Sequence, residues 1–198
     1  MGTNQNERDQ AFERIAQPFH KGHENLTKGL EKETDRGLAL ICASLLEGDL
    51  ERMLLDAMVD DKDARKKMTD VPGAPLGTFY VTTLAAYSFG FISKRLFDDL
   101  NAIRTIRNAF AHAAEPRSFS QQDVRTLVGN LSYGKGNSDA REAFVAAVLA
   151  ARISLFDVTN RIVPRVPRPP GFEGNTEAQL ESRVAFDAGL HHEPSWYR

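Results

Sequence analysis

Apolar residues recur at helical spacing through most of the chain, and no stretch alternates with the period of two that a half-buried strand requires. The clearest stripe follows Thr34, a residue type that often caps a helix start, and it consists of Leu38, Ile41, Cys42 and Leu45. We therefore predict a long helix from Thr34 to about Val59. A weaker helix is predicted near residues 7–16.

The next segment contains a charged run and a connector before the pattern becomes helical again. Residues 60–70 predict a charged helix face or a short helix, and the proline- and glycine-rich residues 71–77 predict a connector. Residues 78–89 have the composition of a third helix, which we expect Gly90 to end as a C-cap.

Cap residues also mark the later helices. Ser93 is expected to cap a fourth helix that runs from Lys94 to about Ala113. The sequences 120–123 (SQQD) and 139–142 (DARE) match capping boxes, which predict a short helix and a long helix to about Val163. Five to six helices with short links predict an all-α helical bundle.

Composition divides the chain into three parts. Residues 1–30 form a polar lead, residues 31–163 carry the helical pattern, and residues 164–198 begin with a proline-rich run that favours an extended arm. We therefore expect one helical domain with a polar N-terminal lead and a proline-rich C-terminal arm and tail.

The overall charge argues against a protein that covers duplex nucleic acid, because the 198 residues carry a formal net charge of -2. No apolar signal region or membrane-spanning run is visible, so we expect a cytoplasmic protein. The single cysteine, Cys42, lies between apolar residues and is expected to be a buried thiol. We predict no metal site and no cofactor.

The predicted fourth helix carries the most unusual pattern, "IRTIRNAFAH" at residues 103–112. At about 100° per residue, Arg107 falls within the apolar arc of the helix, while Arg104, Asn108 and His112 form a polar stripe along its edge. The apolar arc consists of Leu96, Leu100, Ile103, Ile106 and Phe110. A buried arginine needs an anion, because its guanidinium does not deprotonate in proteins.

Two kinds of anion would explain these side chains. Asp49 interrupts the apolar stripe of the long second helix and is the first candidate partner for Arg107, and Arg152 lies within the stripe of the last helix. A structural ion-pair network involving Asp49 and Arg152 is therefore one interpretation. The other is a phosphodiester site with Arg104 as a substrate-binding residue, in which Arg107 stabilises charge at phosphorus and His112 moves protons.

The segment "RNAFAH", Arg107 to His112, resembles the R-x4-H motif of the HEPN superfamily, small helical bundles that often dimerise and include metal-independent endoribonucleases. The wider pattern from residue 31 to residue 113, with "ISK...DDLN.IR.IRN.FAH", resembles the mannitol operon repressor family more specifically. This resemblance implies an HEPN-like bundle, a homodimer paired near the fourth helix, and regulation of sugar-alcohol uptake genes. The superfamily motif implies catalytic roles for Arg107, Asn108 and His112.

These observations leave two classes of function open. No exposed basic recognition helix follows a tight turn, so we expect no direct DNA binding and a regulator that acts through a protein partner. The alternative is a metal-independent endoribonuclease that cleaves RNA with the Arg107, Asn108 and His112 motif, and an unknown ligand would be a third explanation. The position of His112 on the helical wheel predicts that it faces a cleft or an interface rather than the core. A cleft shared between two chains would favour the ribonuclease, and burial against an internal carboxylate would favour the regulator.

Overall fold

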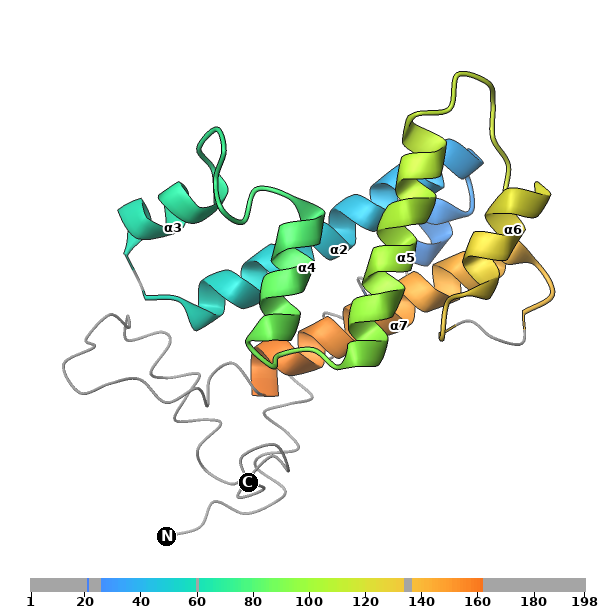
Figure 1. The fold of residues 1–198 in the computed structure, drawn as a ribbon. Helices are drawn as coiled ribbons and strands as arrows, with labels where there is room; N and C mark the ends of the chain where they lie inside the picture. Colours follow the sequence, from blue (N-terminus) through green and yellow to red (C-terminus); the bar gives the residue numbers. More distant parts are fainter. Residues whose placement is uncertain (1–20, 22–25, 60, 134–136, 162–198) are drawn as a thin grey trace, which may run out of the picture.

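The computed structural model describes residues 21, 26–59, 61–133 and 137–161, and every regular element within these ranges is a helix (Figure 1). The prediction of an all-α helical bundle is therefore confirmed. The weak helix expected near residues 7–16 and the arm expected over residues 164–198 lie outside the described residues.

Two long helices, α2 and α7, form one layer, and α4 and α5 cross over them (Figure 1). The short helix α6 packs against α5 and α7, and α3 lies toward the opposite end of the bundle. The helix bounds are α2 (Asp35–Ala57), α3 (Lys62–Thr69), α4 (Phe79–Ser88), α5 (Lys94–Ala111), α6 (Gln122–Gly129) and α7 (Ala140–Arg161).

Three of the predicted N-caps are confirmed, because each side chain accepts a hydrogen bond from a backbone amide in the first helical turn. Thr34 accepts from Gly37 at 3.1 Å, Ser93 from Leu96 at 3.2 Å, and Asp139 from Glu142 at 3.0 Å.

The end of α4 is also set by local chemistry. Gly90 has a φ of 74°, and its amide donates to the carbonyl of Tyr87 while the amide of Phe91 donates to that of Ala86. These two bonds make a Schellman motif, in which glycine takes the left-handed conformation just beyond the cap residue Phe89.

One predicted cap is wrong. α6 begins at Gln122 with Gln121 as its N-cap, and Gln121 makes no side-chain capping bond. Ser120 does not cap the helix because its hydroxyl lies 3.0 Å from that of Ser118, which also accepts the Ser120 amide. Two helix ends also differ from expectation, since α2 ends at Ala57 and α5 at Ala111.

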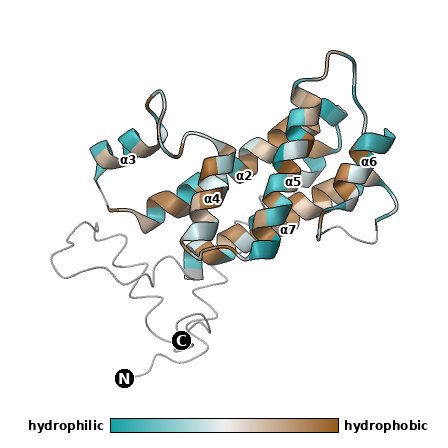
Figure 2. Ribbon diagram, in the orientation of Figure 1, coloured by the Kyte–Doolittle hydropathy of each residue, from teal (hydrophilic) through white to brown (hydrophobic). Residues whose placement is uncertain are grey.

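Apolar side chains from all the large helices meet in one core, and hydrophobic residues recur along both α2 and α7 (Figure 2). At one end of the core the ring of Phe119 lies between Phe110 and Phe144, with ring centroids 4.8 and 5.1 Å away. Cys42 is fully buried, and burial raises the pKa of its thiol to about 12, which fits the expected inert thiol.

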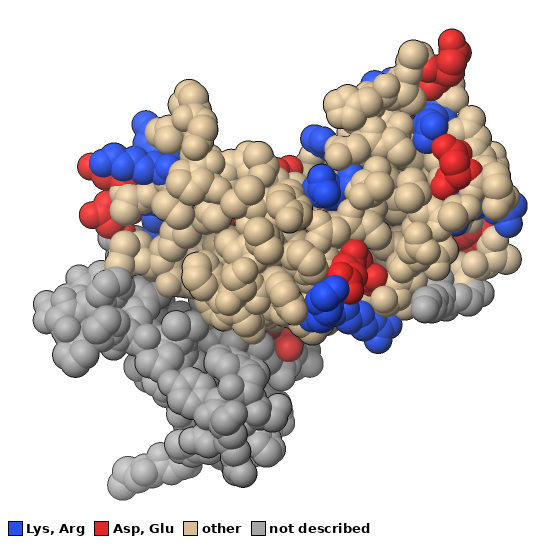
Figure 3. Space-filling view, viewed as in Figure 1, with Lys and Arg blue, Asp and Glu red and all other residues tan. Residues whose placement is uncertain are grey.

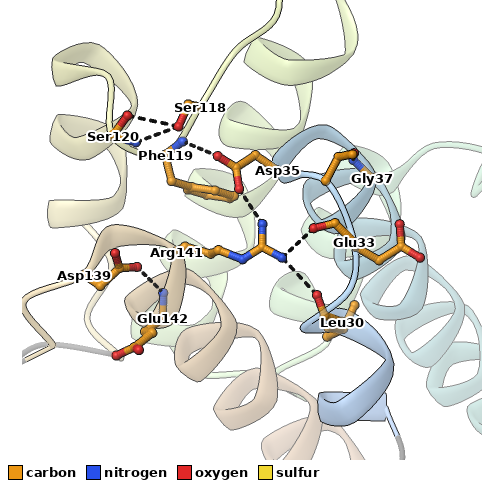
Figure 4. Close-up of polar contacts among 11 residues, drawn as sticks. Leu30, Glu33, Asp35, Gly37, Ser118, Phe119, Ser120, Asp139, Arg141 and Glu142 are labelled. Atoms are coloured by element: carbon orange, nitrogen blue, oxygen red, sulfur yellow. Dashed lines mark hydrogen bonds and ion pairs between the residues drawn. The ribbon is translucent and has the colours of Figure 1, made fainter.

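A polar junction joins the start of α2 to two other parts of the chain (Figure 4). The carboxylate of Asp35 forms an ion pair with Arg141 at the start of α7 and accepts the amide of Phe119 at 3.0 Å. Arg141 also donates to the carbonyl oxygens of Leu30 at 2.9 Å and Glu33 at 2.7 Å. The junction therefore holds α2, α7 and the loop before α6 in one arrangement.

A second buried carboxylate fixes the loop after α6. Asp99 of α5 is 1 % exposed, and it accepts the amides of Ser132 at 2.8 Å and Tyr133 at 3.2 Å. Arg95, one turn earlier, lies over the Tyr133 ring at 4.3 Å and donates to the carbonyl of Ser132 at 3.1 Å. Two residues of α5 thus hold this loop against the bundle.

Within the described ranges, none of the helices combines the length and the apolar character that crossing a bilayer would require.

Asp35 predicts a specific dependence of stability on pH. Burial would raise the pKa of this carboxyl, but hydrogen bonds from the Phe119 amide, Ser118 and Arg141, with the charge of Arg141, leave it below its ordinary value. Such a group stabilises the fold above its unfolded pKa of about 4 and loses this contribution as the pH falls through the lower folded pKa.

We therefore expect the free energy of unfolding to fall more steeply below about pH 4 in the wild type than in Asp35→Asn. Urea unfolding at a series of pH values measures this, with Asp98→Asn as a control, because Asp98 pairs with Lys94 at an exposed position. Equal acid slopes in the wild type and Asp35→Asn would contradict the role of Asp35.

Candidate functional site

The polar stripe of residues 103–112 lies on the C-terminal half of α5, whose inner face consists of the buried apolar residues Ile103, Ile106 and Phe110. Arg104, Arg107 and Asn108 are half-buried, whereas His112 is exposed. The expected apolar arc is buried in full, with Leu96, Leu100, Ile103, Ile106 and Phe110 all at most 3 % exposed.

Arg107 lies beside its sequence neighbour rather than against a carboxylate. Its Nη1 donates to Oδ1 of Asn108 at 3.0 Å. Among the described residues, no Asp or Glu oxygen comes within 4.0 Å of the Arg107 guanidinium.

The predicted contact between Arg107 and Asp49 is therefore wrong. Asp49 is paired with Arg152 of α7, the other member of the expected structural ion-pair network, with Nε to Oδ2 at 2.6 Å and Nη2 to Oδ1 at 3.4 Å. Both side chains of this ion pair are largely covered, at 15 % and 26 % exposure. A helical wheel shows that Asp49 faces inward, but it does not show that this part of α2 faces α7.

Arg104 connects the stripe to α4. Its guanidinium carbon lies 5.1 Å from the centroid of the Tyr80 ring, within the range of a cation–π contact. Its Nε is fully buried and has no hydrogen-bond acceptor. Arg104 is thus held by an aromatic ring, and one of its N–H groups makes no hydrogen bond with the described residues.

His112 is the C-cap residue of α5, and its amide donates to the carbonyl of Asn108 at 3.1 Å. Arg36, in the first turn of α2, donates to the carbonyl of Ala111 at 2.8 Å. The backbone that carries His112 is therefore held from α2, and its imidazole is presented at the surface, as its position on the helical wheel indicates.

The neighbouring helix α4 exposes a stripe of large apolar side chains that the sequence analysis did not identify. Tyr80, Leu84 and Tyr87 are 44 %, 38 % and 37 % exposed, and we call these three residues the α4 face. The ring of Tyr87 lies on that of Phe97 of α5, with centroids 4.7 Å apart. In Figure 3 a broad area without charged atoms covers α4, with basic side chains at its boundary toward α5.

Several side chains on the buried side of α4 are smaller and more polar than those on its exposed side. Its inward residues include Thr82, Thr83 and Ala86, each at most 1 % exposed. Both threonine hydroxyls are hydrogen-bonded to nearby backbone groups. The Thr82 hydroxyl lies 3.0 Å from the carbonyl oxygen of Leu76 and 2.8 Å from that of Thr78. The Thr83 hydroxyl donates to the carbonyl oxygen of Phe79 at 2.7 Å. The helix thus presents larger apolar groups to solvent than several of those it buries.

One signal in the sequence could have revealed the α4 face. Residues 78–89 contain no charged residue, although a helix at the surface of a bundle normally carries a charged side. Apolar periodicity alone does not reveal such a face, because it does not distinguish a helix buried all round from one with an exposed apolar side.

Within the described ranges, no three His, Cys, Asp or Glu side chains come together as ligands for a metal ion.

Comparison with known proteins gives one related fold. No family model and no curated protein matches the chain. The X-ray structure of the MtlR-HPr complex from Escherichia coli contains a similar chain, with a TM-score of 0.58 and 16% sequence identity. The match covers 67% of this chain and 97% of that chain. At this identity the likeness shows a shared fold.

The contacts of the two inward arginines predict different effects on stability. Arg152→Ala leaves the largely covered Asp49 carboxylate without its guanidinium donor, so we expect a loss of about 1–3 kcal/mol in the free energy of unfolding. Arg107→Ala removes a contact to a neighbouring amide and should cost less than about 1 kcal/mol. Urea unfolding at neutral pH compares them, and a larger loss for Arg107→Ala would show that Arg107 has a stronger partner.

Proposed function

We propose that this chain is a regulatory protein that binds a protein partner through α4 and the adjoining edge of α5. The observation that supports this most strongly is the α4 face, Tyr80, Leu84 and Tyr87, which is exposed while smaller groups of the same helix are buried. A protein gains nothing in its own stability by keeping large apolar groups in water. Patches of this kind often mark interaction surfaces.

The residue types of the α4 face suit a protein interface. Tyrosine is enriched where proteins bind one another, because its ring supplies contact area and its hydroxyl tolerates water. The contacts of Tyr80 with Arg104 and of Tyr87 with Phe97 fix these rings before any partner arrives. Such preorganisation lowers the entropy lost on binding.

Two further observations support a regulatory role. The sequence resembles the mannitol operon repressor family, and the fold is similar to that of a chain in the MtlR-HPr complex, which itself joins two proteins. The chain has a net charge of -2 and no basic recognition helix in its sequence. We therefore propose regulation through the partner and not through direct DNA contact.

Photo-crosslinking in cells of the source organism tests this proposal. A photoreactive phenylalanine analogue at position 84 or 87 should yield one discrete product with a second protein, because both positions lie on the α4 face. The same analogue at Thr126, exposed on α6, is the control and should give none. Equal products at all three positions would contradict docking on α4, and a product of two identical chains would assign the face to the expected homodimer.

The endoribonuclease alternative is tested on the same protein. Arg107 donates a hydrogen bond to Asn108, and His112 is exposed. An RNA-cleavage assay therefore decides whether these residues are catalytic. Under our proposal the purified chain leaves RNA intact in EDTA between about pH 6 and pH 8, the range in which histidine usually acts as a general acid or base. Cleavage by the wild type that is lost in His112→Ala would assign the nuclease function instead.

A further inference from the structure

Three polar side chains lie together at the edge of the α4 face. Arg104 and Arg107 are one helical turn apart and both half-buried, and Asn108 is bonded to Arg107. We call Arg104, Arg107 and Asn108 the arginine edge. Among the described residues, neither arginine forms an ion pair with an Asp or Glu side chain.

This arrangement is unfavourable in the isolated chain. Like charges three residues apart on a helix repel each other, and the buried Nε of Arg104 has lost water without gaining an acceptor. The Arg104 guanidinium carbon lies over the Tyr80 ring, 5.1 Å from its centroid, and such a cation–π contact uses the positive charge without using the N–H groups as hydrogen-bond donors. An oxyanion placed against the Nη groups of both arginines would relieve the repulsion and accept hydrogen bonds from them.

Two other basic residues of α5 already have partners. Lys94 is paired with Asp98, and Arg95 lies on Tyr133 and donates to the carbonyl of Ser132. The need for negative charge is therefore concentrated at the arginine edge. A partner whose apolar surface covers α4 would place its own acidic group at this one end.

We infer that the arginine edge binds a carboxylate of the protein partner that docks on the α4 face; this inference rests on the proposed function. Arg104 and Arg107 would donate to the carboxylate oxygens, and the amide of Asn108 would hold Arg107 in position. A carboxylate fits better than a nucleic-acid backbone, because the arginine edge adjoins an apolar face and not an extended basic track. The acidic contact would fix the register in which the partner lies along α4.

A titration of the purified full chain followed by NMR tests the site without the partner. The probe is a blocked tripeptide with glutamate between two leucines, and the matched control has glutamine in place of glutamate. We expect saturable shifts of the Arg104 and Arg107 side-chain N–H signals with the glutamate peptide only. The Arg95 and Arg125 signals should stay unchanged, since Arg95 is already partnered and Arg125 is exposed on α6.

Crosslinking from position 87 tests the same site in the complex. Arg104→Ala and Arg107→Ala should each lower the yield at least about tenfold, because truncating one member of a charged pair buried at an interface weakens binding by about thirtyfold or more. Arg125→Ala is the control and should leave the yield unchanged, and Arg107→Lys should restore part of it.

The possible outcomes distinguish a failure of this inference from a failure of the proposed function. A normal crosslink in both alanine variants, or identical shifts with the two peptides, would overturn the inference and leave protein binding intact. Peptide shifts without any crosslink in the wild type would reject both the proposed function and a partner carboxylate. Stronger saturable shifts with a 2′-O-methyl RNA trinucleotide than with the glutamate peptide would assign the arginine edge to RNA and overturn the inference.

Discussion

The arrangement of the bundle depends on two adjacent residues in the first turn of α2. Asp35 binds Arg141 and the Phe119 amide, and Arg36 binds the last carbonyl of α5. The starts of α2 and α7, the end of α5 and the loop before α6 are thus joined at one place. Helix packing alone allows some sliding between neighbours, whereas directional bonds to backbone groups fix a single register. The same carboxylate binds the backbone amide of Phe119. The ring of Phe119 packs between Phe110 and Phe144 at this end of the apolar core.

This fixed frame explains how α4 can leave large apolar groups outside. α4 needs only a small contact area on the bundle, which Phe79, Ala86 and two threonines with internally satisfied hydroxyls supply. The Schellman motif at Gly90 then turns the chain directly into α5, so that the α4 face and the arginine edge lie side by side. The proposed docking surface is therefore part of a rigid scaffold and not of a loop.

Local chemistry in the sequence accounts for where several of the helices begin and end. Thr34, Ser93, Asp139 and Gly90 act on residues within one helical turn, so their roles could be predicted without knowing any neighbour in space. The prediction for Ser120 is wrong because the capping-box pattern considers only the residues that follow it, whereas its hydroxyl and amide contact Ser118, two residues before it. The partner of Asp49 and the exposure of the α4 face depend on how helices are arranged about one another, and a periodic pattern in one helix does not contain that information.

Amide hydrogen exchange of the full chain, alone and with the protein identified by crosslinking, tests the central claim most directly. Binding on the α4 face should slow exchange of the amides of α4 and of the last turns of α5, while those of α6 and of the outer side of α7 stay unchanged. Protection confined to α6 or α7, with α4 exchanging at the same rate in both samples, would contradict docking on the α4 face.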